Sequence, residues 1–293
     1  MRPAEFEEKE YEFPLYRQLQ QGHPALWPPG QVLEDYLGFD AALRLRDPYF
    51  WGLYGRRRPL RGLSPYRFDW PFLPVTHRHR LPRFGVNCFL QVKRSEVGTR
   101  LPKRLAALGT SRPYFRFGLS SDQQKTLAAA ARRASGKALF VYAAPVFGKS
   151  RELFLHMGAG TMVQNSTFPE VLSLNGHSAW YYNEPGAHGV RNPDFEPIRL
   201  PTLDEHLARL VEAQSRSEQE LSPSEALREL RDQLQEAVSE GEAAHEPRGA
   251  FLMDEWRELD VLATRIDVPP AIVSFLAIEA FAAQFNLLWL TVV

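Results

Sequence analysis

The chain has 293 residues, of which 44% are hydrophobic and 24% are charged, and its formal net charge is zero at pH 7. These values are typical of a soluble globular protein with one large domain or two ordinary ones. The single cysteine, Cys88, excludes a disulfide within the chain and indicates a reducing compartment, so we expect a cytoplasmic protein. The acidic N-terminus carries no apolar run, so no signal peptide is expected.

The charges are strongly segregated along the chain. Residues 43–116 hold 17 lysines and arginines against three acids, whereas residues 204–260 hold six arginines against 16 acids. A basic block of this kind favours a polyanionic partner. The acidic block is typical of a solvated helical region or of a surface that binds another protein.

Short elements are predicted for the N-terminal part of the chain. Residues 1–13 are interpreted as an acidic lead-in, and residues 14–24 could form a short helix. The segment 31–38 is predicted to be a second short helix that ends at a glycine and carries Glu34 off its apolar stripe. Residues 39–45 form another apolar stretch, and periodicity alone leaves open whether it is a strand or a short helix.

The segment 47–84 is rich in proline, arginine and aromatic residues and has no helical or strand periodicity. We interpret it as an extended insertion between two core strands, because long irregular loops in compact domains are usually functional. Arginines interleaved with aromatic rings are typical of segments that pair with phosphates and stack on bases. The cluster expected to neutralise phosphates here is Arg56, Arg57 and Arg58.

The segment 85–95 is predicted to contain a buried strand. Successive side chains of a strand point to opposite sides. One set faces a core, and this set is Val86, Cys88, Leu90 and Val92. The other set is Asn87, Phe89, Gln91 and Lys93. A lysine beside a core strand is costly unless it is paired or has a function, which directs attention to Lys93.

Further elements follow in an order that predicts an α/β fold. A short helix is expected at 100–109, a strand at 114–121, a helix that ends at Gly136, and a buried strand at 137–147. Strand, helix and strand at this spacing form a βαβ-like unit, so we expect a mixed sheet flanked by helices.

The last part of the chain is predicted to be a C-terminal helical region. Its helices are expected at 202–218, 222–240, 251–265 and 271–293. The last of these is long and apolar, but Glu279 lies inside it, and a charge at the centre of a membrane span costs roughly 2–3 kcal/mol. We therefore expect a packing or oligomerisation helix, and a membrane anchor is not favoured.

An acid upstream of an amide and a lysine is a combination suited to cutting phosphodiesters. Mg²⁺ prefers hard oxygen ligands, which the Asp40 carboxylate and the Gln91 side-chain carbonyl can supply. A bound Mg²⁺ or Mn²⁺ would lower the pKa of a water and stabilise charge on the phosphate. Lys93 would orient that water and stabilise the transition state. Glu34 would bind a second ion or a metal-bound water, and Arg94 a flanking phosphate.

These residues also have a plainer interpretation, in which Lys93 and Arg94 are the solvated end of a strand and Asp40 caps a helix. The choice of Glu34 as the second acid has rivals as well. Asp35 lies on the same predicted helix but would point about 100° away. The other rivals are Glu12, which could cap the helix that follows it, and Glu96, which is near Lys93 at an odd spacing.

The pattern Asp40…Gln91-x-Lys93 resembles the PD-(D/E)xK nuclease superfamily, in particular the branch with glutamine in place of the middle acid, as in Mrr-like restriction endonucleases. The hallmark strand of that branch often reads Q-x-K-R, and here it reads Gln91-Val92-Lys93-Arg94. The resemblance covers about residues 14–150. It implies a restriction-endonuclease-like core, metal-dependent cleavage of DNA rather than RNA, and a role in defence against foreign DNA.

The prediction for the whole chain is a nuclease-like α/β domain over residues 1–200 and a helical region over 201–293 that mediates self-association or binds a partner protein. Two alternatives stay open. The chain could be a catalytically silent nuclease-like subunit that binds nucleic acid within a larger complex, or a protein-interaction component that works through its acidic helices. A gel shift separates these alternatives, because affinity for phosphates falls steeply with salt.

Overall fold

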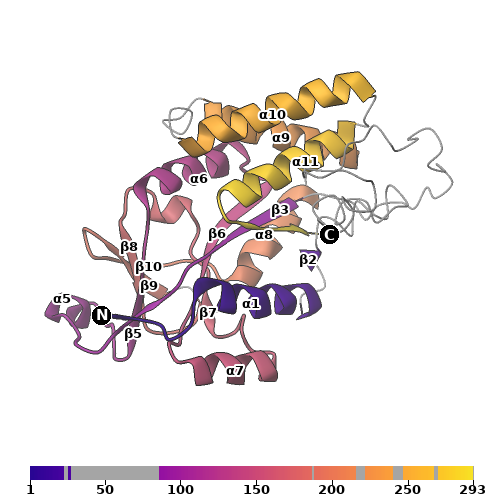
Figure 1. Ribbon diagram of the computed structural model, residues 1–293. Coiled ribbons are helices and arrows are strands. Elements are labelled where there is room, and N and C mark those ends of the chain that lie inside the picture. The colour runs from indigo at the N-terminus through magenta and orange to yellow at the C-terminus, as the bar shows by residue number, and fades with distance from the viewer. Residues whose placement is uncertain are drawn as a thin grey trace, which may run out of the picture.

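The computed structural model describes residues 1–22, 26–27, 86–186, 188–215, 222–239, 247–266 and 270–292. Two β-sheets flanked by helices make up this part of the chain (Figure 1), so the expected α/β architecture is confirmed. The expected βαβ-like unit is wrong, because its strands, predicted at 114–121 and 137–147, lie in different sheets. The predicted helix at 31–38, the apolar stretch at 39–45 and the insertion at 47–84 lie outside the described residues. Their candidate functional residues are Glu34, Asp40, Arg56, Arg57 and Arg58.

The smaller sheet is mixed and contains the strand that carries Gln91. Its five strands, in spatial order, are β2 (Leu26–Trp27), β11 (Leu288–Val292), β3 (Val86–Val92), β6 (Ala138–Pro145) and β7 (Ser166–Thr167). Strands β3 and β6 are parallel, with Gln91 opposite Tyr142, and the other neighbours are antiparallel. The carboxyl ends of β3 and β6 therefore meet at one edge, where Lys93 follows β3.

The larger sheet is antiparallel throughout. Its six strands, in spatial order, are β1 (Arg2–Pro3), β4 (Glu96–Gly98), β5 (Tyr114–Gly118), β8 (Ala179–Tyr182), β9 (His188–Asn192) and β10 (Glu196–Arg199). Only residues 93–95 separate β3 from β4, so the chain passes from one sheet to the other at Lys93.

Helices cover both faces of the smaller sheet (Figure 1). On one face lie α6 (Ser121–Arg133), α9 (Pro223–Ser239), α10 (Pro247–Ile266) and α11 (Pro270–Gln284). On the other face lie α1 (Glu8–Gly22), α7 (Ser150–Ala159) and α8 (Leu203–Ser215). The remaining elements are α5 (Lys103–Ala107), which packs on the larger sheet, and the short 3-10 helix η3 (Leu172–Leu174).

The predicted alternation of β3 is confirmed by the two cores. Cys88 and Leu90 are buried in the core that contains α1, α7 and α8. Phe89 points into the opposite core and stacks on Phe140 of β6, with ring centroids 4.6 Å apart. Burial raises the pKa of the Cys88 thiol to about 12, because the charged thiolate is disfavoured away from water.

The interpretation of residues 1–13 as a lead-in is wrong, because α1 begins at Glu8. Tyr11, Leu15 and Leu19 recur every four residues and are at most 1% exposed. That spacing places all three on one helical face. The high content of acids in this segment hides the stripe, since most of its acidic side chains are on the outer face.

The predicted helix at 271–293 is wrong in its second half. Helix α11 ends at Gln284, Asn286 takes a left-handed conformation with φ of 54°, and residues 288–292 form β11 between β2 and β3. Phe281 of α11 and Phe89 of β3 meet edge to face in the same core, with centroids 6.1 Å apart. Residues of one core therefore lie on both sides of the domain boundary predicted at position 200.

The structure also answers the membrane question for the part that it describes. Among the described residues, no helix has the length and apolar character needed to span a bilayer. The apolar character of α11 is explained by burial, because ten of its residues between Ala271 and Ala282 are buried inside the protein. Whether the C-terminal region mediates self-association stays a prediction.

A hydrogen bond between His206 of α8 and Glu170 makes stability depend on pH. Nδ1 of His206 lies 2.7 Å from Oε1 of Glu170, and this hydrogen bond is the main reason that the pKa of Glu170 is below its usual value. A lowered carboxyl pKa gives stability that is present above the unfolded pKa and is lost as the pH falls through the folded pKa. Glu170→Gln removes this contribution.

We expect Glu170→Gln to lower the melting temperature at neutral pH and to flatten its dependence on pH between about pH 5 and pH 3. The measurement is the melting temperature of both proteins across that range. Glu184→Gln is the control, because Glu184 is an exposed acid in the bend between β8 and β9. Parallel profiles for Glu170→Gln and the wild type would contradict the assignment.

Candidate functional site

The site is built at the carboxyl end of β3. The backbone N–H of Lys93 donates to the carbonyl of Ala143, at 2.8 Å, so the pairing with β6 continues up to the lysine. Gln91, two residues earlier, points to the same side of the sheet and is only 2% exposed. The Lys93 ammonium lies 5.6 Å from the centre of the Tyr142 ring, close enough for a cation–π contact.

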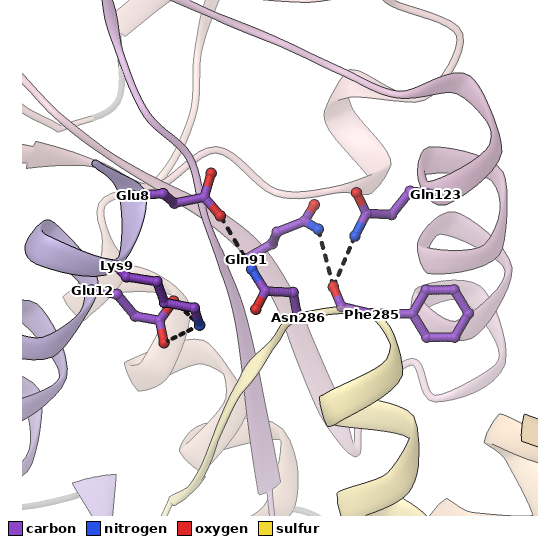
Figure 2. Close-up of polar contacts among 7 residues, drawn as sticks. All are labelled: Glu8, Lys9, Glu12, Gln91, Gln123, Phe285 and Asn286. Atoms are coloured by element: carbon purple, nitrogen blue, oxygen red, sulfur yellow. Dashed lines mark hydrogen bonds and ion pairs between the residues drawn. The ribbon is translucent and has the colours of Figure 1, made fainter. Parts of the chain in front are cut away.

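The amide of Gln91 is fixed on one side only. Its Nε2 donates to the carbonyl of Phe285, at 3.2 Å, and Nε2 of Gln123 in α6 donates to the same carbonyl, at 2.8 Å (Figure 2). This carbonyl lies just beyond α11, where helix carbonyls lack partners within the helix. The Oε1 atom of Gln91 is buried and has no hydrogen-bond partner among the described residues. An unpartnered buried oxygen is costly.

Glu8 approaches the same place from the first turn of α1. Asn286, in the turn between α11 and β11, donates from Nδ2 to Oε1 of Glu8, at 3.1 Å (Figure 2). Burial raises the pKa of the Glu8 carboxyl, and the positive charge of Lys93 partly offsets this. Asn286 and Lys93 therefore both favour the ionised form of a carboxyl group that is held in a partly dry environment.

The pKa of Lys93 is shifted in the opposite direction from that of Glu8. Burial lowers the pKa of its ammonium group, the negative charge of Glu8 opposes that shift, and the positive charge of Arg248 at the start of α10 adds to it. A half-buried lysine between an acid and a second cation is positioned to meet a further negative charge. We call Glu8, Gln91, Lys93, Gln123 and Asn286 the β3-end cluster.

A second layer of contacts holds Tyr142 beneath Lys93. The Tyr142 hydroxyl donates to Oε1 of Gln124, and Nε2 of Gln124 donates to the carbonyl of Val171, at 2.9 Å. The ring therefore has a fixed position on β6, and its burial raises the pKa of the phenol well above the usual value. The aromatic face that Lys93 meets is not free to turn away.

The structure brings together some of the predicted site residues and adds others. Gln91 and Lys93 lie in the cluster, whereas Asp40 and Glu34 lie outside the described residues. Arg94, expected to contact a phosphate, forms an ion pair with Glu7, at 2.8 Å. Its Nη2 also donates to the carbonyl of Ala4, at 2.5 Å. In this structure Arg94 thus joins the N-terminal segment to the end of β3.

The rival acids have other partners. Glu12 pairs with Lys9 of the same helix, at 2.7 Å (Figure 2), and Glu96 pairs with Arg116, at 2.7 Å, across β4 and β5. The acid beside Lys93 is Glu8, which sequence reasoning missed. The available signal was the four-residue spacing of Tyr11, Leu15 and Leu19, since it predicts a helix whose first turn contains Glu8.

In the described part of the chain, no three His, Cys, Asp or Glu side chains come together as a group that could hold a metal ion. The Gln91 amide extends toward Gln123, and the Glu8 carboxylate lies on the other side of Asn286 (Figure 2). The chain matches no family model, no curated protein and no solved structure. Functional inference therefore depends on the β3-end cluster and on its sequence context.

A cavity of about 500 Å³ lies elsewhere, lined by residues of α1, of the segment that follows α7 and of the start of α8. Two polar groups that line it, Gln18 and Ser166, already have partners within the protein. Oε1 of Gln18 accepts from the N–H of Met162, at 2.6 Å, and Ser166 bonds to both Tyr11 and Met162, each at 2.6 Å. The cavity offers little unpaired polarity for a ligand, and the β3-end cluster is the stronger candidate.

Proposed function

We propose that this protein is a metal-dependent nuclease that hydrolyses phosphodiester bonds of DNA at the β3-end cluster. The supporting observation is a half-buried Lys93, under the electrostatic influence of Glu8, two residues after a buried glutamine whose Oε1 has no partner among the described residues. Burying a lysine and an unpaired amide oxygen together costs stability. Such costs are concentrated at functional sites, where perturbed pKa values serve chemistry.

The donor atoms are of the type that a hard divalent ion such as Mg²⁺ or Mn²⁺ prefers. The fit depends on the unpartnered Oε1 of Gln91 and on the Glu8 carboxylate, because amide and carboxylate oxygens are the ligands that these ions prefer. Asp40 is the further carboxylate expected from the sequence. When bound, the ion would lower the pKa of a water and neutralise charge on the phosphate.

The chain's own residues have separable roles in this proposal. Lys93 holds a positive charge in a partly dry site, where it stabilises negative charge on the phosphate more strongly than it would in water. Asn286 orients the Glu8 carboxylate by its hydrogen bond. Gln123 shares the Phe285 carbonyl with Gln91, so the C-terminal end of α11 fixes the direction of the Gln91 amide.

The wider role follows from resemblance alone. The Gln91-Val92-Lys93-Arg94 segment resembles the strand of Mrr-like restriction endonucleases, and that likeness suggests a cytoplasmic enzyme that acts against foreign DNA. Duplex cleavage needs two cuts, so two copies of the chain would supply two sites. Both statements are part of the proposal.

The deciding experiment measures cleavage of plasmid DNA by purified protein with Mg²⁺, with Mn²⁺ and with EDTA. We expect cutting only with metal, and we expect Glu8→Gln and Asp40→Asn to lower the rate by roughly 100-fold or more, as loss of one group that stabilises charge does in other enzymes. Glu10→Gln is the matched control, because Glu10 is an exposed acid in the first turn of α1 and lies outside the β3-end cluster. Cutting that survives in EDTA, or in both variants, would refute the proposal.

One observation favours a second candidate, the catalytically silent DNA-binding subunit. The Nε2 atom of Gln91 is tied to the protein backbone, and Glu8 bonds to Asn286, so both groups have a structural use without any metal. This candidate predicts salt-dependent binding to DNA with no cutting under any metal condition. The same purified protein tests both candidates.

A further inference from the structure

A group of basic residues lies beyond β4, within residues 99–113, which we call the run. It contains four cations and no acid. All four side chains are exposed, and none forms an ion pair with a residue that the structure describes. The four cations are Arg100, Lys103, Arg104 and Arg112.

The run is held rigidly at both ends although its side chains are exposed. Nη1 of Arg112 donates to the carbonyl of Thr99, at 3.2 Å, and the Tyr114 hydroxyl donates to the carbonyl of Arg100, at 2.9 Å. The Tyr114 ring also lies flat against Gly98, where a Cβ would come within 2.1 Å of it. Between these ends, Leu105 of α5 is fully buried. A fixed loop loses little conformational entropy when it binds a ligand.

Aromatic rings extend this surface across the larger sheet. Arg104 lies over the Phe195 ring, 4.7 Å from its centre, and Phe195 stacks on Tyr181, with centroids 5.9 Å apart. Arg116 lies 5.8 Å from the Tyr181 ring centre and also pairs with Glu96. Trp180 and Tyr182, the neighbours of Tyr181, are buried in the core and take no part. The rings keep Arg104 in place over the sheet.

The acids of this sheet only partly offset the charge. Glu96 is engaged by Arg116, and Glu196 accepts from Nε of Arg191, at 2.8 Å. Glu184 and Asp194 are exposed, so the surface as a whole is less positive than the run alone. The four cations nevertheless occupy 15 consecutive positions without an acid among them.

The run is connected to the β3-end cluster by a single strand. Arg100 follows Lys93 by seven residues, which span at most about 25 Å when extended. Since B-DNA rises about 3.4 Å per base pair, this reach corresponds to about seven base pairs of a duplex. The carboxyl end of β3 precedes β4 in the chain and helix α5 follows it, so the two lie toward opposite ends of that strand.

We propose that Arg100, Lys103, Arg104 and Arg112 form a binding surface for the phosphate backbone of duplex DNA, to one side of the β3-end cluster. This inference rests on the proposed nuclease function, because the surface would hold the DNA that the β3-end cluster is proposed to cut. It positions DNA without reading sequence, because contacts to phosphates carry no sequence information directly. The partner is chosen from charge complementarity and from the rigid spacing of the cations.

The test measures binding of a fluorescent duplex of about 30 base pairs by anisotropy in EDTA, over a range of about 50–200 mM NaCl. The variant is Arg100→Gln/Lys103→Gln/Arg104→Gln. Each lost phosphate contact lowers the slope of log affinity against log salt by about 0.9, so the slope should fall by about 2 to 3. The dissociation constant at about 100 mM NaCl should rise roughly tenfold or more.

The control is Arg132→Gln/Arg228→Gln/Arg257→Gln. It changes the net charge by the same amount at exposed arginines of α6, α9 and α10, away from the larger sheet (Figure 1). We expect it to bind like the wild type. If the two triple variants show the same slope, or if the wild type does not bind the duplex at low salt, the inference is overturned.

This test and the test of the proposed function fail separately. Binding in EDTA does not depend on cleavage. If the protein cuts DNA through Lys93 but the Arg100→Gln/Lys103→Gln/Arg104→Gln variant binds normally, only the binding surface is overturned. A protein that never cuts, but whose affinity depends on the three cations, supports the surface and overturns only the nuclease. If this triple variant keeps a normal melting temperature, misfolding is excluded as the cause of its lost affinity.

Discussion

Replacing Lys93 with methionine is expected to lower the proposed metal-dependent DNA cleavage by roughly 100-fold or more, and to leave the protein at least as stable as the wild type. Burial lowers the pKa of Lys93, so its charged form is less favourable in the folded protein than in the unfolded chain. The stability that a lowered lysine pKa gives is present only above the unfolded pKa and is lost as the pH falls through the folded pKa. At neutral pH the charged lysine is therefore a cost, which methionine removes.

The measurements are cleavage rate and melting temperature at neutral pH. Lys137→Met is the matched control, because Lys137 pairs with Glu229 at the surface and lies outside the β3-end cluster. It should keep cleavage and change stability little, as surface ion pairs contribute about 0–1 kcal/mol. A Lys93→Met protein that cuts within a few-fold of the wild type would remove Lys93 from the chemistry. A large fall in melting temperature would instead show that the charge of Lys93 beside Glu8 stabilises the fold.

The part of the site that lies on one strand could be predicted from the sequence. In β3, apolar and mixed positions alternate, so Gln91 and Lys93 follow from the two-residue period once Cys88 and Leu90 are placed in a core. Glu8 and Asn286 could not be assigned in this way. They are far from β3 in the chain, and only the packing of α1 and of the turn before β11 brings them to Lys93.

The C-terminal segment shows a different limit of sequence reasoning. A continuous apolar run has no period that separates a buried helix from a buried strand. Residues 271–293 therefore predict a helix, although Leu288 and its neighbours have the aromatic and β-branched character of strands. Asn286 is the local signal for the break, because asparagine tolerates the left-handed conformation found there. The pairing of Leu288 with Leu90 is a tertiary fact that no local pattern contains.

Replacing Trp289 with alanine is expected to cost about 3–5 kcal/mol of unfolding free energy, the range for large aromatic side chains in cores. Trp289 is 6% exposed and packs between Phe89 and Phe275, with ring centroids 6.1 and 5.2 Å away. Its Nε1 donates to Oδ1 of Asn87, at 2.9 Å, so the variant also leaves a buried acceptor without a partner. Urea denaturation measures the loss.

Two further variants serve as comparisons for the stability of Trp289→Ala. Trp289→Phe keeps a ring against Phe89 but loses the N–H, so it should lie between the wild type and Trp289→Ala. Phe13→Ala is the control, because that ring is 69% exposed on α1 and should change stability by no more than about 0.5 kcal/mol. If Trp289→Ala were as stable as the control, β11 would not be part of the sheet. The turn that places Asn286 beside Glu8 would then lose its anchor, and the β3-end cluster would have to be rebuilt without its C-terminal members.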